Sequence, residues 1–189
     1  MVKRLFWLIE DLVWNIRCRY NFWLHGPYGL SKVVEKMPYR FLTKYLRKYG
    51  ASVGEKCRFE RGLNIHRPIE NPPFKNLSIG NNIYLGHNTL IDLTKKVKIE
   101  DNVIIASRCQ IWTHASFYGS NDIDNLNYQE KLGEVVIKNA SMIYSGVIII
   151  QGITIGERSV IGAGSIIIND VPGFQFFAGN PAKFIKKLN

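Results

Sequence analysis

A six-residue period through residues 137–172 limits what this chain can fold into more than any other feature. Cut into sixes, the stretch reads IKNASM, IYSGVI, IIQGIT, IGERSV, IGAGSI and IINDVP, so that an isoleucine opens every unit. The fifth place of each unit holds a small or β-branched residue, namely Ser141, Val147, Ile153, Ser159, Ser165 and Val171. If both places point inward, each unit forms one short strand and one corner, and three units close one coil. The period therefore predicts a parallel β-helix with strands stacked about 4.8 Å apart.

The competing interpretation is a β-sandwich. Its strands would alternate apolar and polar residues with a period of two and irregular turns, whereas here the six-residue count holds through six consecutive units. The pattern therefore favours the coil. A single unit buries nothing by itself, so the stacked repeats must stabilise one another.

Units of the same kind occur earlier in the chain and open at Val53, Ile79, Leu85, Ile99, Ile105 and Ile111. We expect a β-helix domain over residues 51–172, preceded by a helical, basic and aromatic segment over 1–50. The count breaks at 66–75 and again at 117–134, where we expect an excursion loop; loops of such length in a compact domain are usually functional. Residues 173–189 are predicted to form a tail and a short C-terminal helix that closes the open end of the coil.

The N-terminal segment shows the helical type of periodicity. Apolar residues recur at helical spacing over residues 3–24, and the dipeptides of residues 25–29 indicate a turn. A short helix is expected from Ser31. Another is expected to follow Pro38, which suits the first turn of a helix, and to end at Gly50.

Positive charge is concentrated at the same end of the chain. Residues 1–61 hold 13 of the 25 Lys and Arg residues but only 5 of the 15 Asp and Glu residues. Two interpretations of the first helix stay open: its apolar stripe packs on the β-helix or a neighbouring subunit, or residues 1–24 lie on an anionic membrane surface. Nucleic acid is not an expected partner, since neither a groove-reading basic helix nor an RNA-binding signature is present.

Neither a secretory signal nor a membrane span is expected. Glu10 and Asp11 interrupt the apolar run at the start of the chain, and no window approaches the ~18 uncharged apolar residues of a span. Cys18, Cys57 and Cys109 are an odd number without a disulfide-like pattern, which predicts small core residues in a reducing compartment. We therefore expect a cytoplasmic protein, with peripheral contact at the inner membrane face under the second interpretation above.

Three motifs near the C-terminus carry a family resemblance. Ile-Gly-Ala-Gly-Ser ends at Ser165, Asn-Asp-Val-Pro ends at Pro172, and Ala-Gly-Asn-Pro-Ala-Lys ends at Lys183. Together they resemble the hexapeptide-repeat acyltransferases, most of all the galactoside and maltose types and the polysaccharide O-acetyltransferases. The resemblance covers about residues 79–187 and is absent over 1–50. It implies a left-handed β-helix, a homotrimer and acetyl-CoA as the acyl donor.

The resemblance places the catalytic residue at His114, in the unit just before the excursion loop. Acetyl transfer from a thioester to an alcohol needs a base, donors for the oxyanion and a site that holds both substrates together. Histidine suits the role of base because its ordinary pKa lies near neutrality. Asp92, about one coil earlier, is a candidate either to orient His114 or to bind substrate. A backbone N–H near Ser145 or Gly146 is the expected oxyanion donor.

The resemblance also implies a set of binding residues. Asn88 matches a residue that contacts the acceptor, Ser145 one beside the thioester, and Ala163 one whose backbone meets the pantetheine arm. Lys183 and Lys186 match basic residues near the adenosine phosphates of the donor. Each position has a structural alternative as well: an exposed corner residue for Asn88 and Ser145, and a solvated helix face for the two lysines.

A metal site is the alternative use of the histidines. Some trimeric left-handed β-helices, the γ-class carbonic anhydrases, bind zinc through histidines shared across subunits. The candidates here, His66, His87 and His114, lie at irregular spacings, and His87 and His114 are expected on different faces of successive coils. We therefore expect no metal.

The function that this resemblance implies is that of an acetyl-CoA-dependent O-acetyltransferase acting on a sugar hydroxyl, in surface polysaccharide or lipopolysaccharide assembly. His114 would be the general base, and the acceptor a sugar or glycan. Three alternatives stay open: a xenobiotic acetyltransferase of the streptogramin type, an N-acetyltransferase acting on an amino sugar, and a non-catalytic β-helix scaffold. Binding of acetyl-CoA separates the scaffold from the enzymes.

Overall fold

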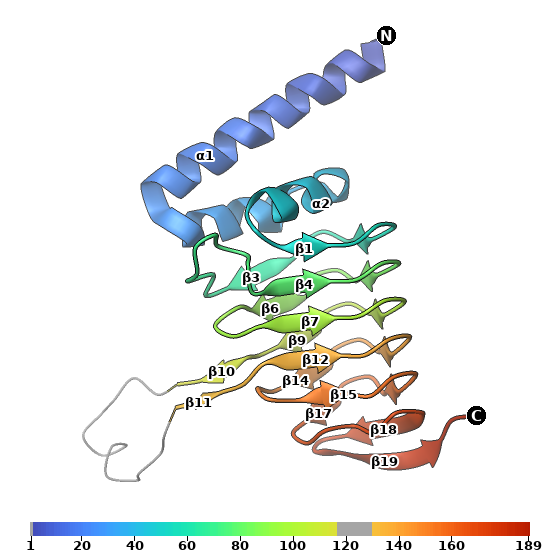
Figure 1. Cartoon of the computed structure of the whole chain (residues 1–189). Coiled ribbons are helices and arrows are strands. Elements are labelled where there is room, and N and C mark those ends of the chain that lie inside the picture. The colour runs from blue at the N-terminus through green and yellow to red at the C-terminus, as the bar shows by residue number, and fades with distance from the viewer. Residues whose placement is uncertain (1, 117–129) are drawn as a thin grey trace.

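The computed structural model of this protein describes residues 2–116 and 130–189, with side chains from Leu5 onward. A tall coil of short strands forms the body, and two helices stand on its N-terminal end (Figure 1). The helices are α1 (Val2–Lys36) and α2 (Tyr39–Lys48). The polypeptide then winds through five coils, each built from one strand of each of three parallel sheets.

The three sheets form the walls of the coil. The first contains β1 (Ser52–Val53), β4 (Leu77–Ile79), β7 (Val97–Ile99), β12 (Val135–Ile137) and β15 (Thr154–Ile155). The second contains β2 (Arg58–Phe59), β5 (Tyr84–Leu85), β8 (Ile104–Ile105), β13 (Met142–Ile143), β16 (Val160–Ile161), β18 (Gln175–Gly179) and β19 (Ala182–Lys187). The third contains β3 (Asn64–His66), β6 (Leu90–Asp92), β9 (Gln110–Ile111), β14 (Ile148–Ile149) and β17 (Ile166–Ile167). Stacking is parallel and in register, as the six-residue period predicts.

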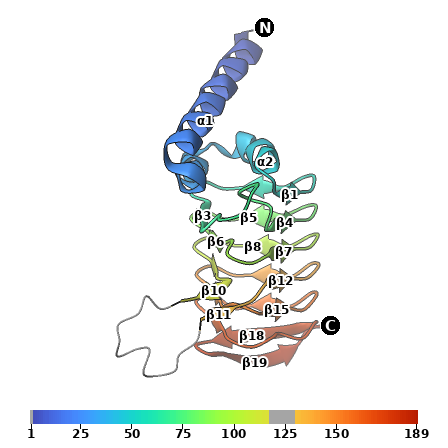
Figure 2. The same cartoon turned by 60° about the vertical axis from the view of Figure 1, so that its left-hand side comes forward.

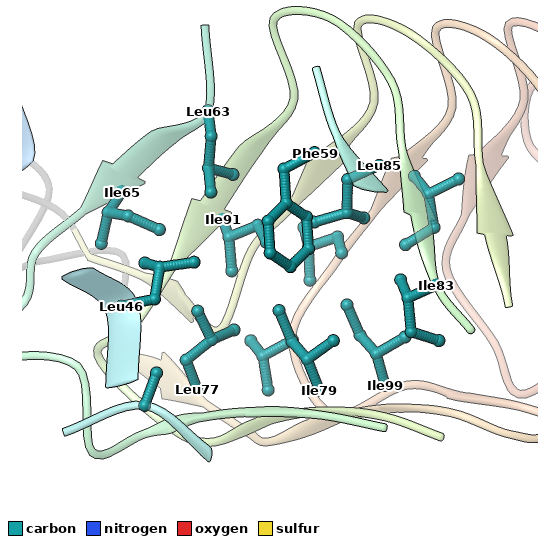
Figure 3. Packing of buried hydrophobic residues seen from close by; sticks show 14 of the residues in the cluster. Leu46, Phe59, Leu63, Ile65, Leu77, Ile79, Ile83, Leu85, Ile91 and Ile99 are labelled. Atoms are coloured by element: carbon teal, nitrogen blue, oxygen red, sulfur yellow. The ribbon is translucent and has the colours of Figure 1, made fainter. Parts of the chain in front are cut away.

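The inward side chains of successive coils form one continuous core. The first places of the hexapeptides, at Ile143, Ile149, Ile155, Ile161 and Ile167, are at most 1% exposed. Burial of a side chain of this size stabilises the folded state by about 1.5–3 kcal/mol. Figure 3 shows the N-terminal part of this core, where aliphatic residues of all three sheets point toward one another.

The fifth places of the units also lie inside. Ser141, Ser159 and Ser165 are buried, and each hydroxyl donates a hydrogen bond to a backbone carbonyl. A small hydroxyl residue fits this place because it fills the corner and satisfies a carbonyl that the turn leaves free. The sequence prediction of inward fifth places is therefore confirmed at these serines.

The two helices close the N-terminal end of the coil. Trp14 and Cys18 of α1 are buried, and Leu46 of α2 belongs to the same core as the aliphatic residues of the first coils (Figure 3). Ion pairs from α2 to α1 join Arg40 to Glu10 and Lys44 to Asp11. Gly26, at φ 60° and ψ −151°, has non-helical backbone geometry and divides α1 into two helical halves at a kink. The turn expected at residues 25–29 is therefore confirmed: the non-helical backbone at Gly26 separates two helical halves of α1.

The first half of α1 projects beyond the coil (Figures 1 and 2). Its outward stripe consists of large apolar side chains that are all more than half exposed: Leu5, Ile9, Leu12, Ile16, Tyr20 and Trp23. No helix in the described part of the chain combines the length and the apolar composition that a membrane span requires. The opposite side of α1 contacts α2 through the ion pairs of Glu10 and Asp11.

The C-terminal segment is a β-hairpin, and the predicted C-terminal helix is wrong. β18 continues the second sheet by pairing in parallel with β16, with Phe176 beside Val160 and Phe177 beside Ile161, and β19 folds back antiparallel onto β18. A helix here would leave the backbone groups of β16 without partners at the end of the sheet. The ring of Phe184 packs edge-on against Phe177, with centroids 6.0 Å apart, which joins the two strands of the hairpin.

The excursion loop leaves the coil after the third sheet. Two short strands, β10 (His114–Ala115) and β11 (Lys131–Leu132), pair antiparallel at its base. Residues 117–129 lie outside the described part of the chain, so the structure describes the loop predicted for 117–134 only over residues 130–134. The loop thus begins directly beside His114.

Candidate active site

Three chemically active side chains meet where strands of the third sheet end. His66 closes β3 and pairs in register with Asp92, which closes β6. His114 follows β9 by three residues and opens β10. Because parallel strands end at the same edge of a sheet, stacking brings together residues that are 22 to 48 positions apart in the sequence.

His114 and Asp92 form a hydrogen-bonded pair. His114 Nδ1 lies 2.8 Å from Asp92 Oδ2, and the carboxylate is fully buried while the imidazole keeps 10% of its surface exposed. A buried carboxylate beside one ring nitrogen leaves that nitrogen as the donor, so the lone pair is assigned to Nε2. The Asp92 carboxylate lies behind the ring, and it is not open to a substrate.

Neighbouring threonines hold the carboxylate in place. Asp92 accepts hydrogen bonds from the Thr113 backbone N–H at 2.9 Å, from the Thr113 hydroxyl, and from the Thr94 hydroxyl at 3.0 Å. Burial alone would raise the pKa of Asp92, but the hydrogen bonds from Thr113, His114 and Thr94 outweigh it and lower the pKa below its usual range. Asp92 is therefore anionic at neutral pH and can stabilise a positive charge on His114.

A second imidazole stacks on the first. The rings of His66 and His114 are nearly parallel, at 11° and with centroids 5.7 Å apart, and Trp112 packs edge-on against both. Burial lowers the pKa of His66, which favours the neutral ring. This packing restricts the rotation of His114 about its side-chain bonds.

The same three residues are the only cluster among the described residues that could hold a metal ion. Ligand atoms of His66, Asp92 and His114 all lie within 4.8 Å of one another. However, Asp92 Oδ2 already accepts bonds from Thr113 and His114, so a metal ion would have to displace the hydrogen bond that orients the ring. His87 takes no part, since it lies at another corner, 3.5 Å from Glu60. The sequence spacing predicts that His87 and His114 lie apart, as they do, but it gives no sign that His66 and His114 meet.

The predicted binding residues lie at a different corner, between the second and third sheets. Asn88, Ser145 and Ala163 are all exposed there, and the Gly164 N–H donates to the Ser145 carbonyl at 2.9 Å. Asn88 has φ 56°, as the corner interpretation predicts. The Gly146 N–H donates to the Ser107 carbonyl and is therefore not free to bind an oxyanion.

The two predicted phosphate-binding lysines lie on β19. Lys183 and Lys186 are exposed strand residues, so the alternative of a solvated helix face is wrong. Lys183 pairs with Ala178 of β18. Gly179, which follows Ala178, donates its N–H to the Ser165 hydroxyl at 3.1 Å. Lys183 therefore lies close to the corner that carries Ser145 and Ala163, and Lys186 lies further along the strand.

One copy of the chain does not bring His114 to this corner. The third sheet separates them, because β9 runs from the corner at Cys109 toward His114. Five residues of extended chain span roughly 15 Å. The predicted site residues thus form two groups: His114 with Asp92 at one edge of the third sheet, and Asn88, Ser145, Ala163 and Lys183 at the other.

Comparison with known proteins identifies the family. A galactoside O-acetyltransferase of Escherichia coli is 33% identical over 146 residues, which make up 76% of this chain and 67% of that protein. The chain belongs to the hexapeptide-repeat acetyltransferase family. A protein of Saccharomyces cerevisiae named as an acetyltransferase is 41% identical over 128 residues, 64% of this chain and 63% of that protein. The chain thus spans less than two thirds of this relative. No family model matches the chain.

Solved structures of this acetyltransferase family have the same architecture. A maltose O-acetyltransferase from Clostridium difficile 630 superposes with a TM-score of 0.72 at 27% identity, covering 94% of this chain and 89% of that one. A galactoside acetyltransferase in complex with coenzyme A superposes with a TM-score of 0.71 at 26% identity, covering 86% and 81%. The family predicted from the Gly-Ala-Gly, Asp-Val-Pro and Gly-Asn-Pro motifs is confirmed.

Sequence reasoning missed three members of the His114 surroundings. The sequence indicates His66 only as a candidate metal ligand, and its motifs give no sign of Thr94 or Trp112. A usable signal was present, because Ile65, Ile91 and Ile111 are the inward residues of stacked strands. The residues that follow them, His66, Asp92 and Trp112, therefore lie above one another on the stacked strands.

Proposed function

We propose that this member of the hexapeptide-repeat acetyltransferase family transfers an acetyl group from acetyl-CoA to a sugar hydroxyl, with His114 as the general base. One observation carries the proposal: His114 Nδ1 is 2.8 Å from the buried, anionic Asp92, which leaves Nε2 as the proton acceptor. An orienting carboxylate behind a histidine is the arrangement that general base catalysis requires.

The reaction follows from this pair. Nε2 of His114 takes the proton of the acceptor hydroxyl while the hydroxyl oxygen bonds to the carbonyl carbon of the thioester. Asp92 stabilises the resulting imidazolium. When the carbon–sulfur bond breaks, the same proton passes to the leaving thiolate, so that the products are the acetyl ester and free CoA. The Ser145 N–H, which has no partner among the described residues, is the candidate donor to the oxyanion.

The donor fits the corner between the second and third sheets. Small exposed residues, Ser145, Ala163 and Gly164, make a wall that an extended chain can approach closely, and a Cβ added at Gly164 would meet nothing within 4 Å. Lys183 and Lys186 would pair with the phosphates. When bound, acetyl-CoA supplies the activated acetyl group. Replacing either lysine by alanine should raise the KM for acetyl-CoA and leave the KM for the acceptor unchanged.

The site is proposed to form between copies of a left-handed homotrimer. The separation of His114 from Ser145 and Ala163 within one chain supports this, because a neighbouring copy could bring its corner against the His114 edge. The test is complementation: His114→Ala and Ala163→Trp proteins, each inactive, are mixed after mild dissociation. Mixed trimers should regain activity. If every site were built within one chain, mixing would restore none.

The outward stripe of α1 is proposed to lie on an anionic membrane, with the coil in the cytoplasm. A lipid-linked glycan for surface polysaccharide would be found at the same membrane surface. The apolar face of α1, flanked by exposed Arg17 and Arg19, supports this choice. The double variant Leu12→Glu, Ile16→Glu should no longer sediment with phosphatidylglycerol vesicles. Ile104→Glu on the second sheet is the matched control and should still sediment with them. If the substitutions disrupted the trimer and left vesicle binding unchanged, the stripe would bind a second copy of the chain and not a membrane.

The activity itself is tested by following free thiol from acetyl-CoA with sugars offered as hydroxyl or amino acceptors. Preference for amino sugars would favour N-acetylation, and resistance of an expressing strain to streptogramins would favour the xenobiotic alternative. His114→Ala should lower kcat by ~10³-fold or more. A protein that shows no heat of binding with acetyl-CoA would be a scaffold.

A further inference from the structure

His66 is the member of the cluster with Asp92 and His114 that the proposed acetyl transfer does not use. Within the described part of the chain no hydrogen bond reaches its ring, which is held by stacking on His114 and by edge contact with Trp112. The residue also lines a cavity of about 370 Å³ between α1 and β3, two elements that lie side by side in Figure 2. An imidazole with free nitrogens, next to a second imidazole and a carboxylate, offers a set of metal ligands.

The three ligand atoms lie close to the spacing that a small ion needs. One ligand atom from each of His66, Asp92 and His114 lies within 4.8 Å of the other two. Zinc binds nitrogen and oxygen at about 2.0–2.2 Å, so two ligands of one tetrahedral ion are roughly 3.4 Å apart. The longest separation therefore has to shorten by at most roughly 1.4 Å. His66 can make this movement because no hydrogen bond holds its ring.

The donor set selects the ion. Two imidazoles and one carboxylate suit a borderline-soft divalent ion such as zinc, whereas magnesium and calcium prefer sites made of oxygen atoms. The anionic Asp92 offsets part of the charge of the ion. The cavity beside His66 leaves room for a water molecule as the fourth ligand, and it gives the ion a path from solvent.

An ion shared by Asp92 and His114 changes the tautomer of the histidine. Nδ1 faces the carboxylate at 2.8 Å and carries the ring proton in the proposed reaction. The ion takes that place, so the Nδ1–H bond breaks, the proton leaves to solvent, and a dative bond forms from Nδ1 to the metal. The neutral ring then takes a proton from solvent on Nε2. Nε2 becomes a donor and has no lone pair with which to accept the proton of an alcohol.

We infer that His66, Asp92 and His114 form an inhibitory zinc site, which switches off the proposed acetyl transfer by holding His114 in the wrong tautomer. The inhibition rests on the proposed function, but the binding of the ion does not. Asp92 keeps both hydrogen bonds from Thr113 and exchanges only the one from His114 for the metal. Sequence spacing predicts no metal, because it does not reveal that His66 stacks on His114.

The test adds zinc chloride to the full chain after metal has been removed with EDTA. Initial rates are followed by the ultraviolet absorbance of the thioester, because the thiol of free CoA would itself bind zinc. We expect one zinc ion bound per chain in calorimetry, and inhibition that EDTA reverses. Cobalt chloride should give the visible absorption bands of a four-coordinate site without a thiolate charge-transfer band, since no cysteine belongs to the described cluster.

His66→Phe keeps a stacked ring and removes one ligand. Loss of a residue that merely supports a metal ligand already lowers metal affinity by about 10- to 100-fold, so loss of a ligand should raise the inhibitory zinc concentration by at least ~10-fold. Inhibition is measured relative to the zinc-free rate of each protein. His87→Phe is the matched control, because His87 is an exposed histidine at another corner, 3.5 Å from Glu60, and this variant should be inhibited like the wild type.

Three outcomes would overturn the inference. The first is a wild-type protein that binds no zinc, or that stays fully active with zinc bound. The second is equal sensitivity of His66→Phe and the wild type, which would place the ion elsewhere. The third is an activity that requires zinc, which would make the ion a cofactor. Absence of acetyl transfer in the zinc-free protein is different, because it would refute the proposed function, while calorimetry with zinc chloride would still decide whether the site exists.

Discussion

Replacement of Asp92 by asparagine separates the two roles that this residue could have. Three donors point at Asp92 Oδ2, from Thr113 twice and from His114 once, whereas Oδ1 faces the Thr94 hydroxyl. An amide fits this arrangement with its oxygen at the Oδ2 position, because the Thr94 hydroxyl can rotate to accept from the amide nitrogen. The substitution therefore keeps the position of the His114 ring and removes the negative charge, together with the long contact of 3.4 Å that the Thr94 N–H donates to Oδ1.

The magnitude follows from the geometry. A contact of 2.8 Å between Nδ1 and Oδ2 puts the charge centres of imidazolium and carboxylate roughly 4 Å apart, where two unit charges at an effective dielectric constant of ~20 attract by about 4 kcal/mol. The neutral amide retains a hydrogen bond of about 1 kcal/mol. The remaining ~3 kcal/mol is lost only when His114 is protonated, that is, in the transition state, so kcat should fall ~100-fold.

The assay is steady-state acetyl transfer with thiol detection for the wild type and Asp92→Asn. We expect the loss in kcat, with the KM values for both substrates within about threefold of wild type. Asp101→Asn is the control, because Asp101 binds the Asn81 N–H at another corner and should leave kcat unchanged. A variant with normal kcat and a raised acceptor KM would refute the positioning role and make Asp92 a substrate-binding residue.

Three further substitutions test other parts of the structure. Thr113→Val removes a hydroxyl that donates to the buried carboxylate and should lower the free energy of unfolding by about 1–3 kcal/mol in urea titrations; a loss below ~0.3 kcal/mol would show that the bond contributes nothing. Ile155→Ala opens a cavity in the core and should cost about 2–5 kcal/mol in the same experiment, and a loss below ~1 kcal/mol would contradict the tight stacking of the coils. His66→Phe keeps a stacked ring but removes the group whose pKa is lowered on folding. The unfolded chain binds the extra proton below about pH 6.5, so wild-type stability should fall there as pH decreases, and the variant should show a shallower slope.

The repeats were predictable because every unit repeats one local requirement. Residues such as Ile155 and Ser159 recur every six positions, and a single register satisfies all of them. The C-terminal hairpin was not predictable in this way. The spacing of Lys183, Lys186 and Lys187 suits a helix, and the strand forms because β16 offers an unpaired edge that only a β-strand can satisfy. That edge is a property of the folded coil, and the isolated segment carries no sign of it.

The candidate site was predictable at His114 but not in its partners, because the contacts depend on how far each coil is offset from the next. In regular coils, residues stacked on successive coils are separated by a constant number of sequence positions. Insertions change this separation, which is 26 positions from His66 to Asp92 and 20 from Asp92 to Trp112. Only the stacked strands reveal that these residues share one register.

The interruptions of the six-residue period themselves mark the site. The segments between β3 and β4, between β6 and β7, and between β9 and β12 all depart from the period, and all three connect the third sheet to the first. His66, Asp92 and His114 stand at the start of these three connections. Between β14 and β15, where the same corner keeps its regular length, no titratable side chain occurs. The backbone groups of a regular corner form hydrogen bonds with the next coil, and little space is left there for catalytic side chains. A repeat fold therefore gains an active site where successive coils depart from the six-residue period at the same corner.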